Sequence, residues 1–412
     1  MFDRSPDTAA LRKVLAEVYT HGHGKDVRGG GTAPVRTPPT TGGHRFATVG
    51  ERGPLAGAVV RVLTAALGPR RWEPWNPYND HRAHPSPRSA FLVDVWLVER
   101  GRRWRVDPVR RLLSGPAVEP GFDSTVRLEL TRHPERLTAG YGPVADALSV
   151  LESGHVLAAL AEASAGLGLA ASLDGDALLL GPALAAFADH ATPPDSMEVE
   201  RVTGTEHWWR RVTAPRSSGP YPVGVAPDPR PLATQTMHTL VRAALRPPSG
   251  SPAGDGSLRH RLALSRVAGH PDGWYAVAGN AHGSGSGSTV ERLVGGNALD
   301  QVQSAFSYER AHADVSSMHV AWVMTADLRA AATTGGAAGY RAVLRTAGAV
   351  AQHVASAAAV AGLFCRPVRS VFEARLEGAA GAPAGHDFVY LLLIGRTRFG
   401  GFAYDLSGEE PR

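Results

Sequence analysis

The stretch from Val126 to Gly168, VRLELTRHPERLTAGYGPVADALSVLESGHVLAALAEASAGLG, is repeated in outline from Val320 to Phe364, VAWVMTADLRAAATTGGAAGYRAVLRTAGAVAQHVASAAAVAGLF. Each copy reads as a short apolar strand, a threonine, a polar loop containing arginine, a Gly or Tyr turn, and a long alanine-rich helix with an internal glycine. Equivalent residues are 194 to 196 positions apart, as in the pairs Thr131 and Thr325, Gly154 and Gly348, and Gly166 and Gly362. A spacing this constant predicts that the chain contains two copies of one fold.

The segments upstream of the two copies also correspond. Each half has an apolar helix pattern, then a Pro-Ser loop, then a hairpin of alternating apolar residues. In the first half these are LAGAVVRVLTAAL, AHPSPRSA and FLVDVWLVERGRRWRVDP, and in the second they are TMHTLVRAAL, RPPSGSPAG and HRLALSRVAGHPDGWYAVAG. The order predicts an α+β fold for each half. We expect an N-terminal helix and flexible linker at 1–40, a first half at 41–195 and a second half at 196–412.

The second alanine-rich helix has a face of small side chains. The small residues that follow one another at short helical spacing are Ala347, Gly348, Ala351, Ala355 and Ala358. A face of this kind lets another helix approach closely. We therefore expect the long helices of the two halves to pack against each other.

The composition is that of a globular protein in which arginine is the main cation. Of the 412 residues 43% are hydrophobic, and lysine supplies only Lys13 and Lys25 among the 43 basic side chains. Arginine suits phosphate and carboxylate binding, whereas amine catalysis needs lysine, so this class of chemistry is nearly excluded. The net charge is +5, but the arginines are scattered along the sequence rather than gathered in one basic run, which argues against nucleic-acid binding.

Cysteine, histidine and hydropathy limit the chemistry and the compartment. The single cysteine, Cys365, allows no internal disulfide and no cysteine-based zinc site, and its apolar neighbours predict a buried packing role. His21 and His23 stand in a glycine-rich stretch without further ligands, so we assign them no metal. The N-terminus has no signal-peptide core, and no run approaches the ~18 apolar residues of a membrane span. We expect a soluble, cytoplasmic protein.

The segment Arg210–Leu232, RRVTAPRSSGPYPVGVAPDPRPL, sets an arginine and two hydroxyls among prolines and glycines. Arg216, Ser217 and Ser218 could bind a phosphate, because a guanidinium pairs bidentately with phosphate and hydroxyls donate to neighbouring oxygens. The same triplet could also be a turn between the two halves. The residues alone leave both interpretations open.

The order of these motifs resembles the nitroreductase-like flavoprotein superfamily, and most of all its SagB-type dehydrogenase branch from peptide-modifying pathways. In the second half the resemblance lies in PRSSGPYPVG, GYRAVLRTAGAVAQHVASAAAVAGL and FVYLLLIGR, and in the first half in HPSPRSAFLVDVWLV, GRRWRVDP and ESGHVLAALAEASAGLG. It covers roughly residues 41–402. Members of this superfamily hold FMN at a two-fold dimer interface. The resemblance therefore implies that the two halves form a fused pseudo-dimer within one chain.

The resemblance assigns FMN binding to three segments. They are Arg216, Ser217 and Ser218 at the phosphate and ribityl chain, Gly395, Arg396 and Arg398 at the same phosphate, and Pro85, Ser86, Arg88 and Ser89 near the ring. In the first half, Arg45 in GGHRFATVG is followed by no hydroxyl, and the late strand ALLLGPAL is followed by no Gly-Arg pair. We expect one competent FMN site per chain, with the second degenerate.

The catalytic group is less clear from the sequence. Azoline dehydrogenases of this family are associated with a Lys-Tyr pair, which this chain lacks because both lysines lie in the N-terminal extension. Tyr340 is the remaining candidate for an acid/base or substrate-contacting group. It could equally pack in a turn, since Tyr141 holds a similar place in the first copy. Tyr308, His312 and His319 are further options.

The resemblance implies an FMN-dependent dehydrogenase that oxidises thiazoline or oxazoline rings of a ribosomally synthesised peptide. A precursor peptide would be the substrate, and a cyclodehydratase or other biosynthetic enzymes would be partners. One alternative is an NAD(P)H-dependent reductase of nitro or quinone compounds, which shares the fold and the cofactor. The other is a flavin-free member of a peptide-modifying complex.

Overall fold

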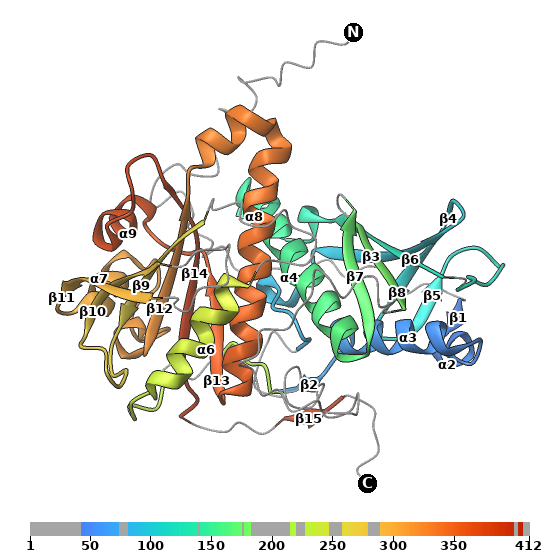
Figure 1. Cartoon of the computed structure of the whole chain (residues 1–412), viewed down its shortest axis with the longest axis horizontal. Helices are drawn as coiled ribbons and strands as arrows, with labels where there is room; N and C mark the ends of the chain where they lie inside the picture. Colours follow the sequence, from blue (N-terminus) through green and yellow to red (C-terminus); the bar gives the residue numbers. More distant parts are fainter. Residues whose placement is uncertain are drawn as a thin grey trace.

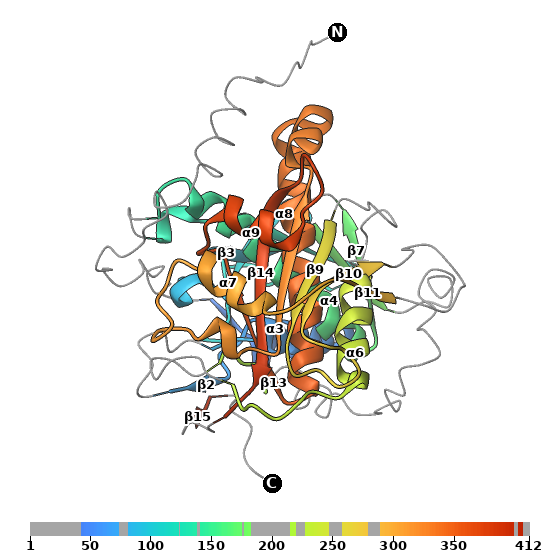
Figure 2. The ribbon, with the colours of Figure 1, turned by 90° about the vertical axis from the view of Figure 1, so that its left-hand side faces the viewer.

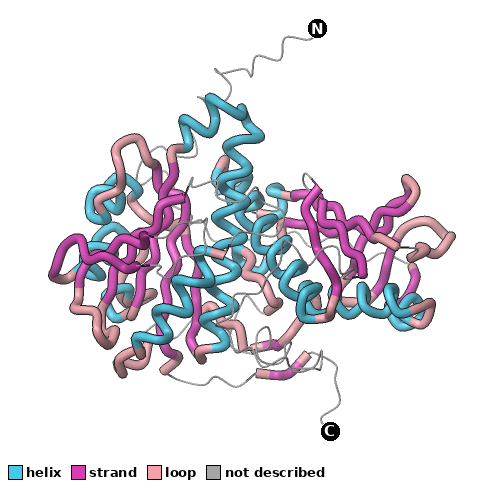
Figure 3. Tube along the Cα trace, viewed as in Figure 1, coloured by secondary structure: helices cyan, strands magenta, loops and turns pink. Residues whose placement is uncertain are grey.

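Two sheets lie on opposite sides of a pair of long helices (Figure 1). The structure is a computed structural model that describes residues 43–73, 81–122, 124–137, 141–174, 177–182, 215–219, 227–246, 258–278, 289–398 and 403–406. The expected N-terminal helix and linker at 1–40, which include both lysines, His21 and His23, and most of the second Pro-Ser loop lie outside the described residues. Figure 3 shows the strands as two separate groups with helices between them.

The first sheet has seven antiparallel strands in the order β1-β5-β4-β3-β6-β8-β7. Its strands are β1 (His44–Arg45), β3 (Val93–Glu99), β4 (Arg102–Asp107), β5 (Leu112–Ser114), β6 (Val126–Arg132), β7 (Leu169–Asp174) and β8 (Ala177–Pro182). Its helices are α2 (Phe46–Gly50), α3 (Pro54–Leu67) and α4 (Val144–Gly166), with short 3-10 turns η2 (Pro87–Ser89) and η3 (Pro134–Arg136). The apolar residues of α3 and α4 and of one sheet face form a shared core.

The second sheet has six antiparallel strands in the order β11-β10-β9-β12-β14-β13. Its strands are β9 (Leu258–Leu264), β10 (Gly273–Ala278), β11 (Thr289–Gly295), β12 (Val320–Ala326), β13 (Leu363–Val368) and β14 (Asp387–Arg396). Its helices are α6 (Thr234–Leu245), α7 (Ala298–Ala305), α8 (Leu328–Val360) and α9 (Glu373–Ala380), with the 3-10 turn η7 (Val315–Ser317). Helices cover both faces, α6 and α8 on one and α7 and α9 on the other (Figure 2). Every residue of the central strand β12 is accordingly buried.

The two sheets repeat one strand order, which confirms the duplication that the sequence predicts. The order β5-β4-β3-β6-β8-β7 corresponds strand by strand to β11-β10-β9-β12-β14-β13, and β1 is an addition to the first sheet. The alternating apolar stretches form the hairpins β3–β4 and β9–β10 as expected. The chain therefore has an α+β architecture in two equivalent halves.

The predicted packing of the two long helices is confirmed at two glycines. A Cβ atom added to Gly154 would lie 2.0 Å from the carbonyl oxygen of Arg345, and one added to Gly348 would lie 2.0 Å from that of Leu151. The two contacts are equivalent in the repeat, since Gly154 and Gly348 are 194 positions apart and so are Leu151 and Arg345. The helices α4 and α8 thus cross at a pseudo-two-fold axis, with backbone against backbone.

The sequence predicts a polar loop and then a glycine turn before Tyr340; in the structure the loop residues are helical, whereas the turn is present. The helix begins at Leu328, and the side chain of Asp327 caps it by accepting a hydrogen bond from the amide of Ala330. The backbone leaves the helical conformation at Gly336, whose φ of 58° suits glycine, so the predicted glycine turn is present as a kink between two helical segments. The part of α8 before the kink lies at the top of the molecule in Figure 1, and the part after it runs down beside α4.

The C-terminal segment returns to the first half. Strand β15 (Tyr404–Asp405) pairs with β2 (Arg71–Trp72), and the amide of Leu406 donates to the carbonyl of Arg70. This small sheet joins the C-terminal segment of the second half to β2 of the first half, and β2 contains Arg71.

Helix α4 is long and apolar enough to cross a membrane by length and composition, contrary to the expectation that no run approaches such a span. Its apolar window is 89% buried inside the protein. The helix is therefore explained as a core element, since it packs against α3, the first sheet and α8.

Candidate functional site between the two halves

Residues 215–219 run along the outer edge of the second sheet. The amide of Cys365 in β13 donates to the carbonyl of Ser217 (2.9 Å), and the Arg366 Nε atom donates to the carbonyl of Ser218 (2.8 Å). The Ser217 hydroxyl accepts a hydrogen bond from the amide of Gly219 (3.1 Å). These bonds fix the backbone on either side of Arg216, so the Arg-Ser-Ser triplet is part of the folded edge.

The Arg216 side chain is 4% exposed and points toward the first half. Its Nε donates to the carbonyl of Arg82 (3.1 Å), and its Nη1 lies 3.4 Å from the Ser218 hydroxyl. The Arg71 guanidinium donates to the carbonyl of Arg216 (2.8 Å). Burial, and then the charge of Arg71, lower the pKa of Arg216 to about 10.

Arg216 forms no ion pair with a carboxylate in the described part of the chain. Glu73, whose charge raises the pKa of Arg216, pairs instead with Arg71 (2.9 Å) and His81 (3.2 Å). A buried cation without a charged partner is costly, and an anion bound beside it would remove that cost. The donors around Arg216 therefore fit a phosphate group, the anionic part of FMN.

The Pro-Ser loop of the first half contacts Arg216 through the carbonyl of Arg82. Its backbone is strained, since Arg88, Ser89 and Phe91 have φ values of 50°, 53° and 48°, which are rare for side-chain-bearing residues. The Ser86 hydroxyl holds the loop closed, because it accepts from the amide of Phe91 (2.8 Å) and donates to Glu152 Oε2 (2.8 Å).

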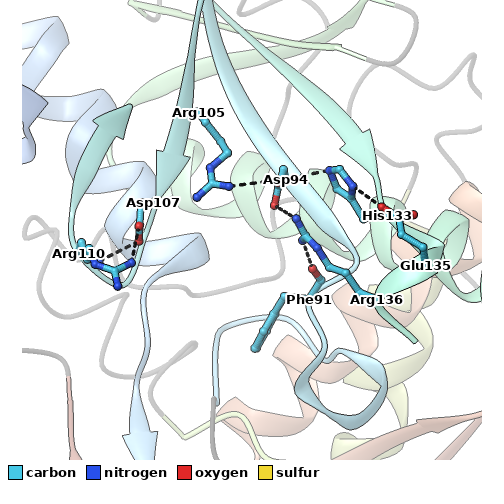
Figure 4. Close-up of polar contacts among 8 residues, drawn as sticks. All are labelled: Phe91, Asp94, Arg105, Asp107, Arg110, His133, Glu135 and Arg136. Atoms are coloured by element: carbon cyan, nitrogen blue, oxygen red, sulfur yellow. Dashed lines mark hydrogen bonds and ion pairs between the residues drawn. The ribbon is translucent and has the colours of Figure 1, made fainter. Parts of the chain in front are cut away.

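A cluster of charged side chains fixes Phe91, the residue that follows the Pro-Ser loop (Figure 4). Asp94 Oδ1 pairs with Arg136 (2.8 Å), and the same guanidinium donates to the carbonyl of Phe91. Asp94 Oδ2 faces His133 (3.3 Å) and Arg105 (3.9 Å). Asp94 of β3 thus orients Arg136, which donates a hydrogen bond to the carbonyl of Phe91, a residue with positive φ.

Glu152 of α4 lies directly beneath this loop. It is 2% exposed, and burial raises the pKa of its carboxyl to about 8, against the opposing effects of the Ser86 and Leu92 hydrogen bonds and of Arg82 and Arg136. Its Oε1 atom is buried and has no hydrogen-bond partner among the described residues. A buried carboxyl with this pKa is largely protonated at neutral pH.

A hydrogen-bond chain crosses the interface beside Glu152. Gln352 of α8 donates to the carbonyl of Ala83 (3.1 Å), so its Oε1 must be the acceptor for Nδ1 of His155 (3.2 Å). Burial lowers the pKa of His155 to about 3, so the ring is neutral and its Nε2 accepts from the Tyr390 hydroxyl (3.3 Å). The chain links the Pro-Ser loop and α4 of the first half to α8 and β14 of the second.

The C-terminal Gly-Arg segment lies on the other side of β13 from Arg216. Arg396 pairs with Leu363, at the start of β13, and its carbonyl accepts from the amide of Asp228 (2.9 Å). Its Nε is buried without a hydrogen-bond partner among the described residues. A Cβ on Gly395 would lie 2.6 Å from Pro227, so the glycine lets the incoming chain pack on the strand. Arg398, two residues on, is exposed.

The structure brings together some predicted residues and separates others. Tyr340 is 3% exposed within the core shared by α6, α8 and the second sheet, which favours the packing alternative for this tyrosine. Tyr308 and His312 are exposed, whereas His319 is buried and donates to the carbonyl of Arg230 (2.8 Å). Arg45 is exposed on β1, at the far edge of the first sheet.

Sequence reasoning missed Glu152, His155 and Gln352. They occupy buried positions of two alanine-rich helices, where a long polar side chain is expensive unless it is hydrogen-bonded. That anomaly is the signal that could have found them. Their partners lie far away in the sequence, 197 residues in the case of His155 and Gln352.

No protein-family model and no curated protein sequence matches this chain. Among solved structures, a candidate nitroreductase from Anabaena variabilis is similar over 89% of this chain and 94% of its own, with a TM-score of 0.69 and 15% identity. The E. coli microcin synthetase complex McbBCD with truncated pro-MccB17 bound is matched over 45% of this chain and 71% of its own, with a TM-score of 0.36 and 18% identity. An FMN-dependent nitroreductase from Clostridium difficile is matched over 45% of this chain and 88% of its own, with a TM-score of 0.31 and 11% identity.

The likeness to the Anabaena structure spans both halves of the chain. The strand order, the crossing of α4 and α8, and this likeness agree on one architecture. The chain has the nitroreductase fold, with both halves of the pseudo-dimer supplied by one polypeptide.

Proposed function

We propose that this chain is an FMN-dependent dehydrogenase that oxidises thiazoline or oxazoline rings of a ribosomally synthesised peptide to thiazole or oxazole. The observation that carries the flavin part is Arg216, a buried guanidinium between the two halves with neutral acceptors only. The peptide part rests on the resemblance of the sequence motifs to SagB-type dehydrogenases. A cytoplasmic location and a cyclodehydratase or similar partner belong to the same proposal.

In this proposal the phosphate lies against Arg216, Ser217 and Ser218. Bound FMN would supply a two-electron acceptor, and the protein would supply binding, orientation and proton transfer. Further binding is assigned to Gly395, Arg396 and Arg398 and, from the first half, to Pro85, Ser86, Arg88 and Ser89. The division into an N-terminal extension at 1–40, a first half at 41–195 and an FMN-carrying second half at 196–412 is part of the proposal.

The interface supports one such site per chain. By the repeat spacing, the positions equivalent to His155 and Gln352 are Ala349 and Ala158. The second, pseudo-equivalent place on the α4–α8 interface therefore cannot form the hydrogen-bond chain that holds the Pro-Ser loop. Arg45, the arginine expected there, is exposed at a distant sheet edge.

The first test is the visible absorption spectrum of the purified protein, with released flavin quantified per chain. We expect about one FMN per chain in the wild type and loss of most of it in Arg216→Ala. Arg230→Ala is the matched control, because Arg230 has a 74% exposed side chain that pairs only with Asp228 among the described residues. Equal flavin loss in both variants would contradict a specific role for Arg216.

The NAD(P)H-dependent reductase alternative has the same fold and cofactor, so the compound that reduces the flavin distinguishes it from the azoline dehydrogenase. A dehydrogenase of azolines loses its flavin absorbance when the azoline peptide is added without oxygen and regains it in air. A reductase loses it with NAD(P)H instead.

The flavin-free alternative is favoured by the absent Lys-Tyr pair and by the low exposure of Arg216. It predicts a colourless protein that does not take up added FMN and that co-purifies with a biosynthetic enzyme. Flavin uptake at one per chain would exclude it.

A further inference from the structure

Glu152 is a buried carboxylic acid hydrogen-bonded to the Pro-Ser loop, and the proposed reaction requires a proton-transferring group. Oxidising an azoline removes two hydrogens, one as hydride and one as a proton that a base must take. The lysine of the family's Lys-Tyr pair has no counterpart among the described residues, since Lys13 and Lys25 precede them. Glu152 is an acid on α4, 2% exposed, that is fixed to the Pro-Ser loop by Ser86 (2.8 Å).

The two oxygens of this carboxyl have different surroundings. Oε2 accepts the hydrogen bond from Ser86, whereas Oε1 is buried and without a partner in the described part of the chain. An unpartnered buried oxygen costs free energy, and native proteins keep such groups mainly where a ligand or reaction uses them. Glu152 is therefore held through one oxygen, while the other has no hydrogen-bond partner among the described residues.

The groups that face Glu152 come from four elements. Arg82 directly precedes the Pro-Ser loop, Arg136 is the last residue of η3, Tyr390 is on β14, and His155 is one turn along α4. The two arginines favour the ionised carboxylate, while burial favours the protonated acid more strongly. Tyr390 and His155 are bonded to each other and neutral, so they add no opposing charge.

We propose that Glu152 is the proton-transferring residue of this site, acting through Oε1. In its ionised form the carboxylate takes the proton from the azoline ring carbon, the electrons of that C–H bond become the new ring double bond, and hydride leaves the adjacent carbon to the flavin oxidant. The proposal rests on the proposed function, because it needs both an azoline and a bound flavin. Ser86 is a positioning residue in this scheme.

The reaction should then depend on pH through Glu152. Only the ionised form accepts a proton, so ring oxidation should rise with pH and level off above a pKa near 8. A reductase using the same group as an acid would show the opposite dependence. The direction of the pH profile thus also separates the two flavin functions.

The experiment compares wild type, Glu152→Gln and Glu162→Gln. Glu162 is a matched control in the same helix, since burial also raises its pKa, to about 7, and its carboxylate accepts from Ser356 (2.7 Å) on the far part of the interface. We expect Glu152→Gln to keep its flavin and to lose ring oxidation by roughly 10²–10⁴-fold with no rising pH limb. Glu162→Gln should keep both the rate and the profile.

A second readout does not need the reaction. In pH-difference infrared spectra, a protonated carboxylic acid gives a carbonyl band that disappears on ionisation. The component that titrates near pH 8 should vanish in Glu152→Gln and persist in Glu162→Gln.

The outcomes separate the two proposals. If the wild type takes up no flavin, the proposed function fails, and the reaction assigned to Glu152 fails with it. If it binds flavin and oxidises azolines but Glu152→Gln has the wild-type rate and pH profile, only the role of Glu152 is overturned. Absence of the infrared component in the wild type would likewise overturn the protonated state that the profile requires.

Discussion

Replacing either crossing glycine by alanine should force α4 and α8 apart. In Gly154→Ala the new Cβ would lie 2.0 Å from the Arg345 carbonyl oxygen, about 1.4 Å closer than the 3.4 Å at which ordinary contact begins. The obstacle is backbone, so no side-chain rotation can relieve it. Gly348→Ala meets the Leu151 carbonyl in the same way.

The expected cost follows from two opposing terms. Overpacking a well-packed core costs about 1–3 kcal/mol and occasionally more, and a rigid backbone obstacle belongs at the upper end. Alanine in place of glycine within a helix returns about 1 kcal/mol. Each single variant should therefore lose about 2 kcal/mol of unfolding free energy. The double variant should lose clearly less than twice that, because one separation of the helices accommodates both methyl groups.

The assay is urea unfolding followed by circular dichroism, with Gly335→Ala as the control. Gly335 is exposed in the same helix, and an added Cβ there meets nothing within 4 Å, so this variant should be neutral or slightly stabilising. Strict additivity of the two core variants would refute the reasoning. So would a destabilisation of Gly154→Ala no larger than that of Gly335→Ala.

Three further outcomes follow from the site. Asp94→Ala leaves the Arg136 clamp on Phe91 without its carboxylate and should cost about 2–3 kcal/mol, measured by the same unfolding assay. Because the folded-state pKa of Glu152 is raised from 4.5 to about 8, its contribution to stability should be present below pH 4.5 and be lost as pH rises toward 8, and urea midpoints of Glu152→Gln should lack this decline. Burial raises the pKa of the Cys365 thiol to about 12, so a thiol reagent should modify it only at the rate of unfolding, and rapid labelling of the native protein would contradict this.

The sequence pattern was sufficient for the architecture. Alternating apolar residues located the hairpins, and the constant repeat spacing predicted two copies of one fold, which the matching strand orders confirm. The small residues around Gly348 predicted the helix contact that the structure shows. These features are local in sequence, because each depends on the spacing of residues within one element.

The parts that could not be predicted depend on tertiary contacts or on competing local preferences. The two adjacent glycines before Tyr340 indicated a turn, and the backbone does kink at Gly336, but the polar loop expected before them is helical because alanine propensity and the Asp327 cap favour a helix. Glu152 and His155 looked like isolated polar residues in an apolar helix. Their roles depend on Ser86, on Gln352 and on the loop, which meet them only after the two halves have packed.

Duplication constrains the two sides of the interface differently. Gly154 and Gly348 stand at the crossing itself, so each is needed by both halves, and both copies retain glycine. Positions off the axis face one side only and are free to diverge. One side carries His155 and Gln352 in a satisfied hydrogen-bond chain, and the equivalent positions on the other side are alanines that pack without polar cost. This asymmetry supports the proposal that the FMN site lies on the side of Arg216.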